Sequence, residues 1–280
     1  MTRSKKLKII IRIFSIIGLI LFAWAFWLEP SSLIVKEHNV VIEDLPKPLE
    51  KLRIAFITDL HVGSAYNGLD NLKKIVKKTN QTKPDIIIIG GDYINGDGKG
   101  KNVTIEEMAI ELKALSAPLG VWTTLGNHDI WYDSPKIKRI FSEYGIEILD
   151  NENIKISRGD KHFWLVGISD YVTNSHDVDT SLKGINDNAP IIGMNHTPDI
   201  FPELPDRILL TLAGHTHGGQ VYFPVIGRLI VPSDYGEKYA VGHIQEGKKH
   251  LFVSTGIGTS ILPVRFLVPP EISVINLIGK

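Results

Sequence analysis

The stretch Arg53–His61 reads RIAFITDLH, a short apolar run that ends in an aspartate and a histidine. Its first six residues are typical of a strand buried on both faces of a sheet. The same layout recurs at Asp85–Asp92, DIIIIGGD, and at Val121–Asp129, VWTTLGNHD. Apolar residues at helical spacing lie between these runs, at Leu69–Val76 and Ile105–Leu115. This βαβαβ order predicts an α/β fold with parallel strands and helices on the faces of the sheet.

The second half of the chain is richer in predicted strands. Short apolar runs bounded by turn residues lie at 146–149, 154–157, 163–168, 190–194, 208–213, 251–254 and 272–277. Residues 29–50 are expected to hold a connection and a first edge strand. Residues 51–280 are then expected to form one domain, because neither a repeat nor a low-complexity linker interrupts them.

Residues 9–28 form an apolar run of 20 residues whose only charge is Arg12. As a helix it is about 30 Å long, which matches the hydrocarbon core of a bilayer. The basic residues in and before this run are Arg3, Lys5, Lys6, Lys8 and Arg12. We therefore expect residues 1–8 to form a cytoplasmic tail and the domain to lie outside the cytoplasmic membrane, on a single-pass signal-anchor. A cleaved signal peptide is the alternative, because Ala23-Trp24-Ala25 fits a small-x-small cleavage site.

Composition narrows the chemistry. The 280 residues include no cysteine, which excludes disulfides, zinc–thiolate sites and a cysteine nucleophile. Lys and Arg number 31, as do Asp and Glu, but residues 29–280 hold 26 basic and 31 acidic residues. This net negative charge gives no case for binding nucleic acid.

Metal-binding residue types follow five of the predicted strands at the point where each strand ends. The seven side chains with oxygen or nitrogen donors are Asp59, His61, Asp92, Asn127, His196, His215 and His217. Sites in open α/β sheets form at this edge. Because one metal takes about four to six ligands, seven donors suit two metals that share a carboxylate, and this donor set favours Mn, Fe or Zn over Ca. Two such metals can act in displacement at phosphorus.

The order of these motifs resembles the calcineurin-like metallophosphoesterases over about residues 52–280: Asp-x-His, Gly-Asp, Gly-Asn-His-Asp, His and Gly-His-x-His. The resemblance implies a four-layer α-β-β-α sandwich with mixed sheets. It also implies that Asp92 bridges two metals. One metal would be held by Asp59, His61 and His217, and the other by Asn127, His196 and His215. His128 would protonate the leaving group without binding a metal.

Two longer stretches, Gly214–Gln220 and Gly258–Phe266, resemble a bacterial, membrane-anchored branch of the family. That branch includes cell-envelope phosphodiesterases and UDP-diacylglucosamine pyrophosphohydrolases. The resemblance implies a phosphodiesterase or pyrophosphohydrolase with two divalent ions, Mn first among them, acting on a membrane-associated, envelope or lipid-linked substrate. Pyrophosphohydrolysis of UDP-diacylglucosamine specifically, or an inactive scaffold of the same fold, are the alternatives.

One departure from the family concerns Gly-Asp-x-x-Asp-Arg, the motif of its protein-phosphatase branch. Asn95 and Gly96 stand here in place of the second acid and the arginine. This argues against a phosphoprotein phosphatase and leaves open which acid orients His128, with Asp97 and Asp129 as candidates. Arg265 is expected to contact the substrate phosphate instead.

Overall fold

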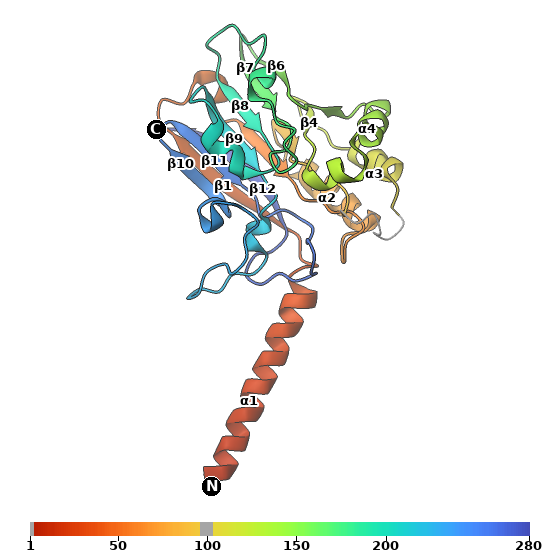
Figure 1. Ribbon diagram of the computed structural model, residues 1–280, viewed down its shortest axis with the longest axis vertical. Helices are drawn as coiled ribbons and strands as arrows, with labels where there is room; N and C mark the ends of the chain where they lie inside the picture. The colour runs from red at the N-terminus through yellow and green to blue at the C-terminus, as the bar shows by residue number, and fades with distance from the viewer. Residues whose placement is uncertain (1–2, 96–102) are drawn as a thin grey trace.

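The computed structural model describes residues 3–95 and 103–280. Two six-stranded sheets pack face to face, and helices cover their outer faces (Figure 1). The first sheet contains β1 (Ile34–Ile42), β12 (Glu271–Gly279), β2 (Arg53–Ile57), β3 (Ile86–Ile89), β4 (Val121–Thr123) and β5 (Glu147–Ile148), in that order. The second contains β10 (Gly242–Glu246), β11 (Lys249–Val253), β9 (Ile208–Ala213), β8 (Ile191–Met194), β7 (Lys161–Gly167) and β6 (Glu152–Arg158).

Both sheets are mixed. In the first, β12 runs antiparallel to β2 and the other neighbours are parallel. In the second, the outer pairs β10–β11 and β6–β7 are antiparallel. The predicted strands are confirmed to within two residues at their ends, β1 is the expected edge strand, and β10 was not predicted.

The core follows from the period-two alternation of strand side chains. In β2, Ile54 and Phe56 pack between the two sheets, whereas Ala55 and Ile57 pack under the helices. The covering helices are α2 (Leu69–Gln81), α3 (Ile105–Leu112) and α4 (Asn127–Glu143). A strand buried on both faces is therefore apolar along its whole length.

The outer face of the second sheet is covered by short elements: α5 (Val178–Ser181) and the 3₁₀ turns Pro198–Glu203 and Gly236–Tyr239. The expected α-β-β-α sandwich is confirmed, and these short helices form its fourth layer.

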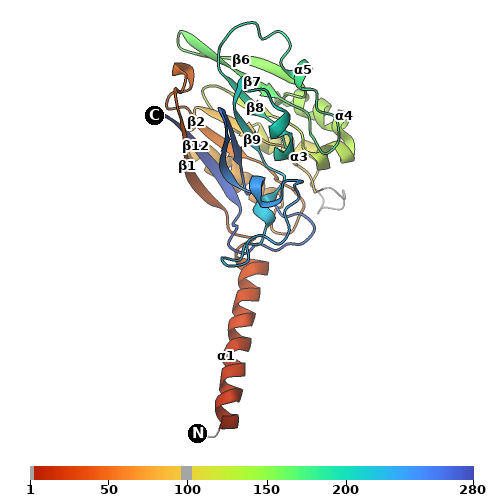
Figure 2. The same cartoon turned by 60° about the vertical axis from the view of Figure 1, so that its left-hand side comes forward.

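The apolar N-terminal helix α1 (Arg3–Ala23) continues as a π-helical turn, Trp24–Leu28, and projects away from the sandwich (Figures 1 and 2). Its side chains are exposed, Phe14 to 70% and Leu19 to 69%. By length and composition, Arg3–Leu28 could cross a membrane, as predicted.

Candidate metal centre

The predicted ligands follow the carboxyl ends of neighbouring parallel strands. β2, β3 and β4 are adjacent in the first sheet, and β8 and β9 are adjacent in the second. The first sheet contributes Asp59, His61, Asp92 and Asn127, and the second contributes His196, His215 and His217. Six of the seven fall into two compact groups, and Asn127 follows β4 at the same edge.

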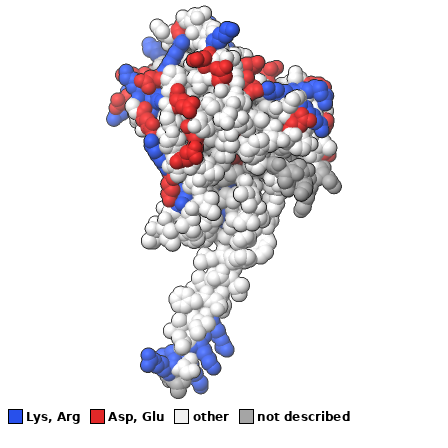
Figure 3. Space-filling model, viewed as in Figure 1, with Lys and Arg blue, Asp and Glu red and all other residues white. Residues whose placement is uncertain are grey.

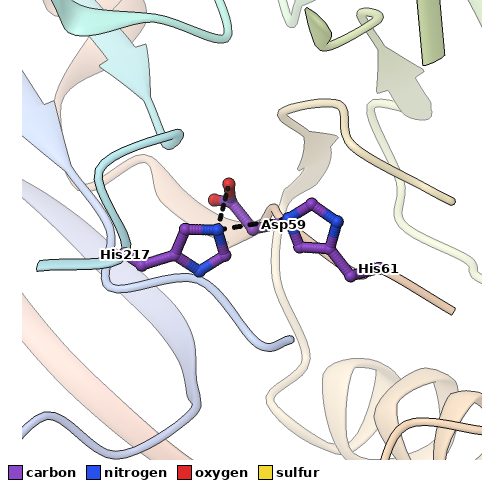
Figure 4. Close-up of side chains that lie close together, drawn as sticks. All are labelled: Asp59, His61 and His217. Carbon is purple, nitrogen blue, oxygen red and sulfur yellow. Dashed lines mark hydrogen bonds and ion pairs between the residues drawn. The ribbon is translucent and has the colours of Figure 1, made fainter. Parts of the chain in front are cut away.

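The first group is formed by Asp59, His61 and His217 (Figure 4). The Nε2 atoms of His61 and His217 lie 3.1 Å apart, and His217 Nε2 lies 3.5 Å from Asp59 Oδ1. Two nitrogens that each sit about 2.0–2.1 Å from one metal at right angles are about 3 Å apart. The observed spacing therefore fits a shared cation.

The second group is formed by Asp92, His196 and His215. Asp92 Oδ2 lies 3.2 Å from His196 Nε2 and 3.5 Å from His61 Nε2, which belongs to the first group. The other carboxylate oxygen of Asp92 accepts the backbone N–H of His128 at 3.0 Å. One oxygen of Asp92 thus faces a histidine of each group, which is the geometry that a bridging carboxylate needs.

Backbone carbonyls select the tautomers of two of the histidines. His61 Nδ1 lies 3.1 Å from the carbonyl oxygen of Ile94, and His196 Nδ1 lies 2.7 Å from that of Gly90. A carbonyl oxygen only accepts hydrogen bonds, so each Nδ1 carries the proton. The lone pair of each Nε2 is then free for a metal.

Two buried polar atoms of the predicted ligands, His196 Nε2 and Asn127 Oδ1, have no hydrogen-bond partner among the described residues. Such atoms are rare in folded proteins and call for an explanation. A cation would satisfy both, and imidazole, carboxylate and amide donors together suit a divalent transition metal. The residues present therefore fit a dinuclear divalent metal site.

Burial sets the charge of most predicted ligands. It raises the pKa of Asp59 to about 6 and lowers the pKa of His61 to about 4 and that of His215 to about 3. These histidines are therefore neutral, which is the metal-binding form. His196 differs: burial lowers its pKa, but Asp92 and Asp59 outweigh burial and raise it well above its usual value.

The backbone at the site adopts an uncommon conformation. Five predicted ligands have positive φ angles: Asp59 (53°), His61 (41°), Asp92 (55°), His215 (66°) and His217 (51°). The chain also approaches itself closely, because a Cβ on Gly126 would lie 2.1 Å from Asp92 Oδ1. Strained loops of this kind concentrate at functional sites.

His128, the predicted general acid, lies at the edge of the site, with 21% of its side chain exposed. Its Nε2 is 4.0 Å from Asp92 Oδ2, and its ring packs edge-on against His61 at 4.8 Å between centroids. It lies close enough to His61 and Asp92 to form a third possible metal-binding group. Its exposure distinguishes it from the almost fully buried His61 and Asp92.

Asp129 supports the metal site through Asp92. Its buried carboxylate accepts the backbone N–H groups of Asp92 (2.8 Å), Tyr93 (2.9 Å) and Gly126 (2.9 Å). Burial, reinforced by the charge of Asp92, raises its pKa to about 7. No hydrogen bond joins it to the His128 ring within residues 3–95 and 103–280, and Asp97, the other candidate, lies outside those residues.

Arg265 is placed differently from the expectation. It is fully buried, and its guanidinium donates hydrogen bonds to the carbonyls of Val268, Thr255, Gly256 and Gly258. Its Nη2 lies 3.5 Å from His217 Nδ1. A buried side chain with these partners cannot contact a substrate in this conformation. Arg265 instead holds the loop that packs behind Asp59 and His61.

A pocket of about 390 Å³ opens beside the metal-binding groups. Asp92, His128, His215 and His217 contribute to its lining. Its apolar lining residues are Val221, Leu229, Ile230, Pro232, Ile261, Leu262 and Val264. The metal-binding groups are thus reached through a largely apolar pocket.

Comparison with known proteins agrees with this geometry. Residues 52–219 match the family model described as calcineurin-like phosphoesterase. The metallophosphoesterase YkuE of Bacillus subtilis is 31% identical over 91% of this chain and 89% of its own length. The phosphodiesterase YaeI of Escherichia coli is 26% identical over 92% and 93%. In fold, the NAD nucleotidase of Haemophilus influenzae matches 74% of this chain and 45% of its own, with a TM-score of 0.50 at 16% identity.

Proposed function

The chain belongs to the calcineurin-like phosphoesterases and is a metal-dependent phosphoesterase, and from this we propose that it hydrolyses phosphodiesters or pyrophosphates of a membrane-associated or envelope substrate. The observation that carries the proposal is the position of Asp92 Oδ2 between His61 and His196, beside an open apolar pocket.

The roles proposed for the residues follow from their placement. Bound in the two groups, divalent cations would lower the pKa of water and draw charge from the phosphoryl oxygens. Asp59, His61 and His217 would hold one ion, and Asn127, His196 and His215 the other, with Asp92 shared. An oxygen derived from water forms a new bond to phosphorus as the bond to the leaving group breaks. His128 then gives its proton to the leaving oxygen.

A diester or pyrophosphate is favoured over a phosphoprotein because Asn95 and Gly96 replace the acid and arginine of the protein-phosphatase motif. The presence of all seven predicted ligands and of His128 supports an active enzyme over an inactive scaffold. Hydrolysis of UDP-diacylglucosamine is one specific form of the proposal. Mn is the proposed metal, with Fe or Zn as alternatives that suit the same donors.

We further propose that residues 9–28 remain as an uncleaved anchor, with residues 1–8 in the cytoplasm and the catalytic domain, residues 51–280, outside. The exposed apolar side chains of α1 need a nonpolar surrounding. Figure 3 shows basic residues gathered at the far end of this helix. Protease added to spheroplasts should then digest the domain, and full protection would reverse the orientation.

The catalytic proposal is tested on the full-length chain in detergent. Metal-stripped protein should not hydrolyse bis(4-nitrophenyl) phosphate, and added Mn²⁺ should restore turnover. Asp92→Asn should lose bound metal and reduce turnover by about 100-fold or more, because both ions share this residue. A wild-type protein that binds two ions and shows no turnover of either a diester or a pyrophosphate would support the scaffold instead.

A further inference from the structure

Two loops beside the pocket expose large apolar side chains. We call them the apolar rim and define it as residues 221–232 and 258–267. Its most exposed apolar side chains are Val225 (97%), Ile226 (67%), Leu229 (68%), Ile230 (78%), Ile261 (98%) and Leu262 (57%). So many exposed large apolar side chains on two loops are unusual on a soluble protein and indicate a binding surface.

The apolar rim is fastened to the end of the N-terminal helix. The backbone N–H of Arg265 donates to the carbonyl of Ala25 at 3.0 Å, and that of Val268 donates to the Glu29 carboxylate at 2.6 Å. The two rim loops are joined to each other, since the N–H of Tyr222 donates to the carbonyl of Phe266 at 2.9 Å. Figures 1 and 2 place both loops at the end of the domain from which α1 leaves.

This attachment fixes the position of the rim relative to the apolar run. Ala25, to which Arg265 is hydrogen-bonded, lies within the apolar run of residues 9–28. Ile261 is four residues from Arg265 along the chain, so these two residues are at most about 14 Å apart. Trp24 and Trp27, one residue before and two residues after Ala25, are exposed aromatic residues of the type that favours a membrane interface. A bilayer that surrounds α1 would therefore reach the rim.

The low density of charged residues in the apolar rim also suits contact with a bilayer. Arg228 is the one charged residue of residues 221–232 and 258–264. It stacks on Tyr222 at 4.6 Å and donates to the carbonyl of Gly218, so it does not point outward as a free charge. On the face drawn in Figure 3, the end of the domain next to α1 is nearly free of charged side chains.

The rim is also part of the pocket. Leu229, Ile230, Ile261 and Leu262 line the pocket that contains His128 and are exposed at the surface as well. A molecule that reaches the metal centre through this pocket must pass between these exposed apolar side chains.

We propose that the apolar rim inserts into the outer leaflet beside α1 and that the enzyme takes its substrate, a phosphate ester carried by a membrane lipid, directly from that leaflet. The phosphate would lie at the metal centre and the adjoining hydrocarbon between the rim side chains. Hydrolysis would break the bond between phosphorus and the leaving oxygen and add water across it. The inference rests on the proposed function and anchor, and it adds the insertion of the rim into the leaflet and the route by which the substrate reaches the pocket.

Insertion is measured without reference to activity. The chain has no cysteine, so Ile226→Cys and Asp160→Cys each provide one site for a fluorescent label. Asp160 is exposed in the turn between β6 and β7. In the full-length chain in phosphatidylcholine nanodiscs, doxyl lipids should quench the label at 226 and leave the label at 160 unchanged. Equal quenching at both sites would overturn the proposal.

Substrate delivery is tested with two diesters that share a nitrophenolate leaving group. One is soluble bis(4-nitrophenyl) phosphate, and the other is a dialkylglycerol 4-nitrophenyl phosphodiester embedded in the nanodisc. The double variant Val225→Asp/Ile226→Asp changes two rim residues that do not line the pocket. It should reduce turnover of the lipid by about tenfold or more and leave the soluble diester unaffected. Ile110→Asp, at an exposed residue of α3, is the matched control and should change neither.

Unchanged turnover of the lipid by the double variant would contradict the proposal. Failure of the wild type on both diesters would contradict the proposed function instead, and the quenching measurement would still decide whether the rim inserts. A double variant that fails to fold would likewise leave the decision to quenching, which uses a milder substitution.

Discussion

The carboxylate of Asp129 accepts the backbone N–H of Asp92 at 2.8 Å, so an acid on α4 fixes the conformation of the residue that faces both metal-binding groups. The same carboxylate accepts the N–H of Gly126, which ties the loop after β3 to the loop after β4. Asp92 is held in this way at a φ angle of 55°.

Asp129→Asn should lower both stability and metal content. An amide presents its own N–H group to backbone donors, so at least one buried N–H loses its acceptor, at a cost of about 1–3 kcal/mol in the free energy of unfolding. Thermal unfolding in detergent and metal analysis would measure the two effects. Asp70→Asn, at an exposed position on α2, should change neither. Unaltered metal content in Asp129→Asn would contradict the supporting role.

His128→Ala should keep two bound metals and lose activity according to the leaving group. A general acid contributes about 100- to 10,000-fold when the leaving group is poor. Turnover of an alkyl phosphodiester should fall within that range, whereas a nitrophenyl diester, whose leaving group needs little protonation, should be affected much less. Loss of metal would show that His128 is a ligand, and an equal loss on both substrates would contradict its role as the general acid.

Arg265→Met should destabilise the protein by about 3 kcal/mol or more, because four carbonyls lose their buried donor. The loop behind Asp59 and His61 should loosen, and metal content should fall with stability. Thermal unfolding and metal analysis test this, with the exposed Arg139→Met on α4 as the control. A direct phosphate contact would instead raise KM and leave unfolding unchanged.

Metal binding should release protons near neutral pH. Asp92 and Asp59 raise the pKa of His196 well above its usual value, so a metal that binds its Nε2 competes with a proton. Below pH 6 the carboxyl of Asp59, whose pKa is raised to about 6, also takes up a proton. Affinity should therefore fall as the pH is lowered through about 6. Calorimetry in two buffers of different ionisation enthalpy would count the protons, and a count of zero would contradict this account.

The sequence predicted the strands and the six candidate ligands that cluster in the structure, because both depend on local pattern. An apolar run as short as Ile86–Ile89 is long enough for a buried strand and too short for a helix, so its length predicts a strand. The polar residue that follows the run marks the end of the strand. β10 was missed because its sequence GHIQE is polar and its burial is only partial. The pairing of β1 with β12, more than 200 residues apart, carries no local signal.

The roles of Asp129 and Arg265 depended on contacts that only the folded chain supplies. The sequence offered Asp129 as a candidate to orient His128, and the structure places it three residues after Gly126, in the first turn of α4. Which loop its carboxylate would hold could not be predicted, because Asp92 lies in the loop after a different strand, β3. Arg265 looked available for phosphate because an arginine is usually exposed. Its full burial follows from carbonyls that converge on it from a loop turning beneath the metal site.

The positive φ angles at five predicted ligands also limit how the site could change during evolution. Asp, Asn and His tolerate this region better than most side chains, and β-branched residues are outliers there. Exchanges among these three types preserve the loops while altering the charge and the metal preference. Recruitment of valine, isoleucine or threonine at Asp59, Asp92 or His215 would require the loop itself to be rebuilt. The backbone conformation thus restricts which residue types can occupy these positions, whether or not they bind a metal. Within the permitted types, the metal preference of the site can change without a change of fold.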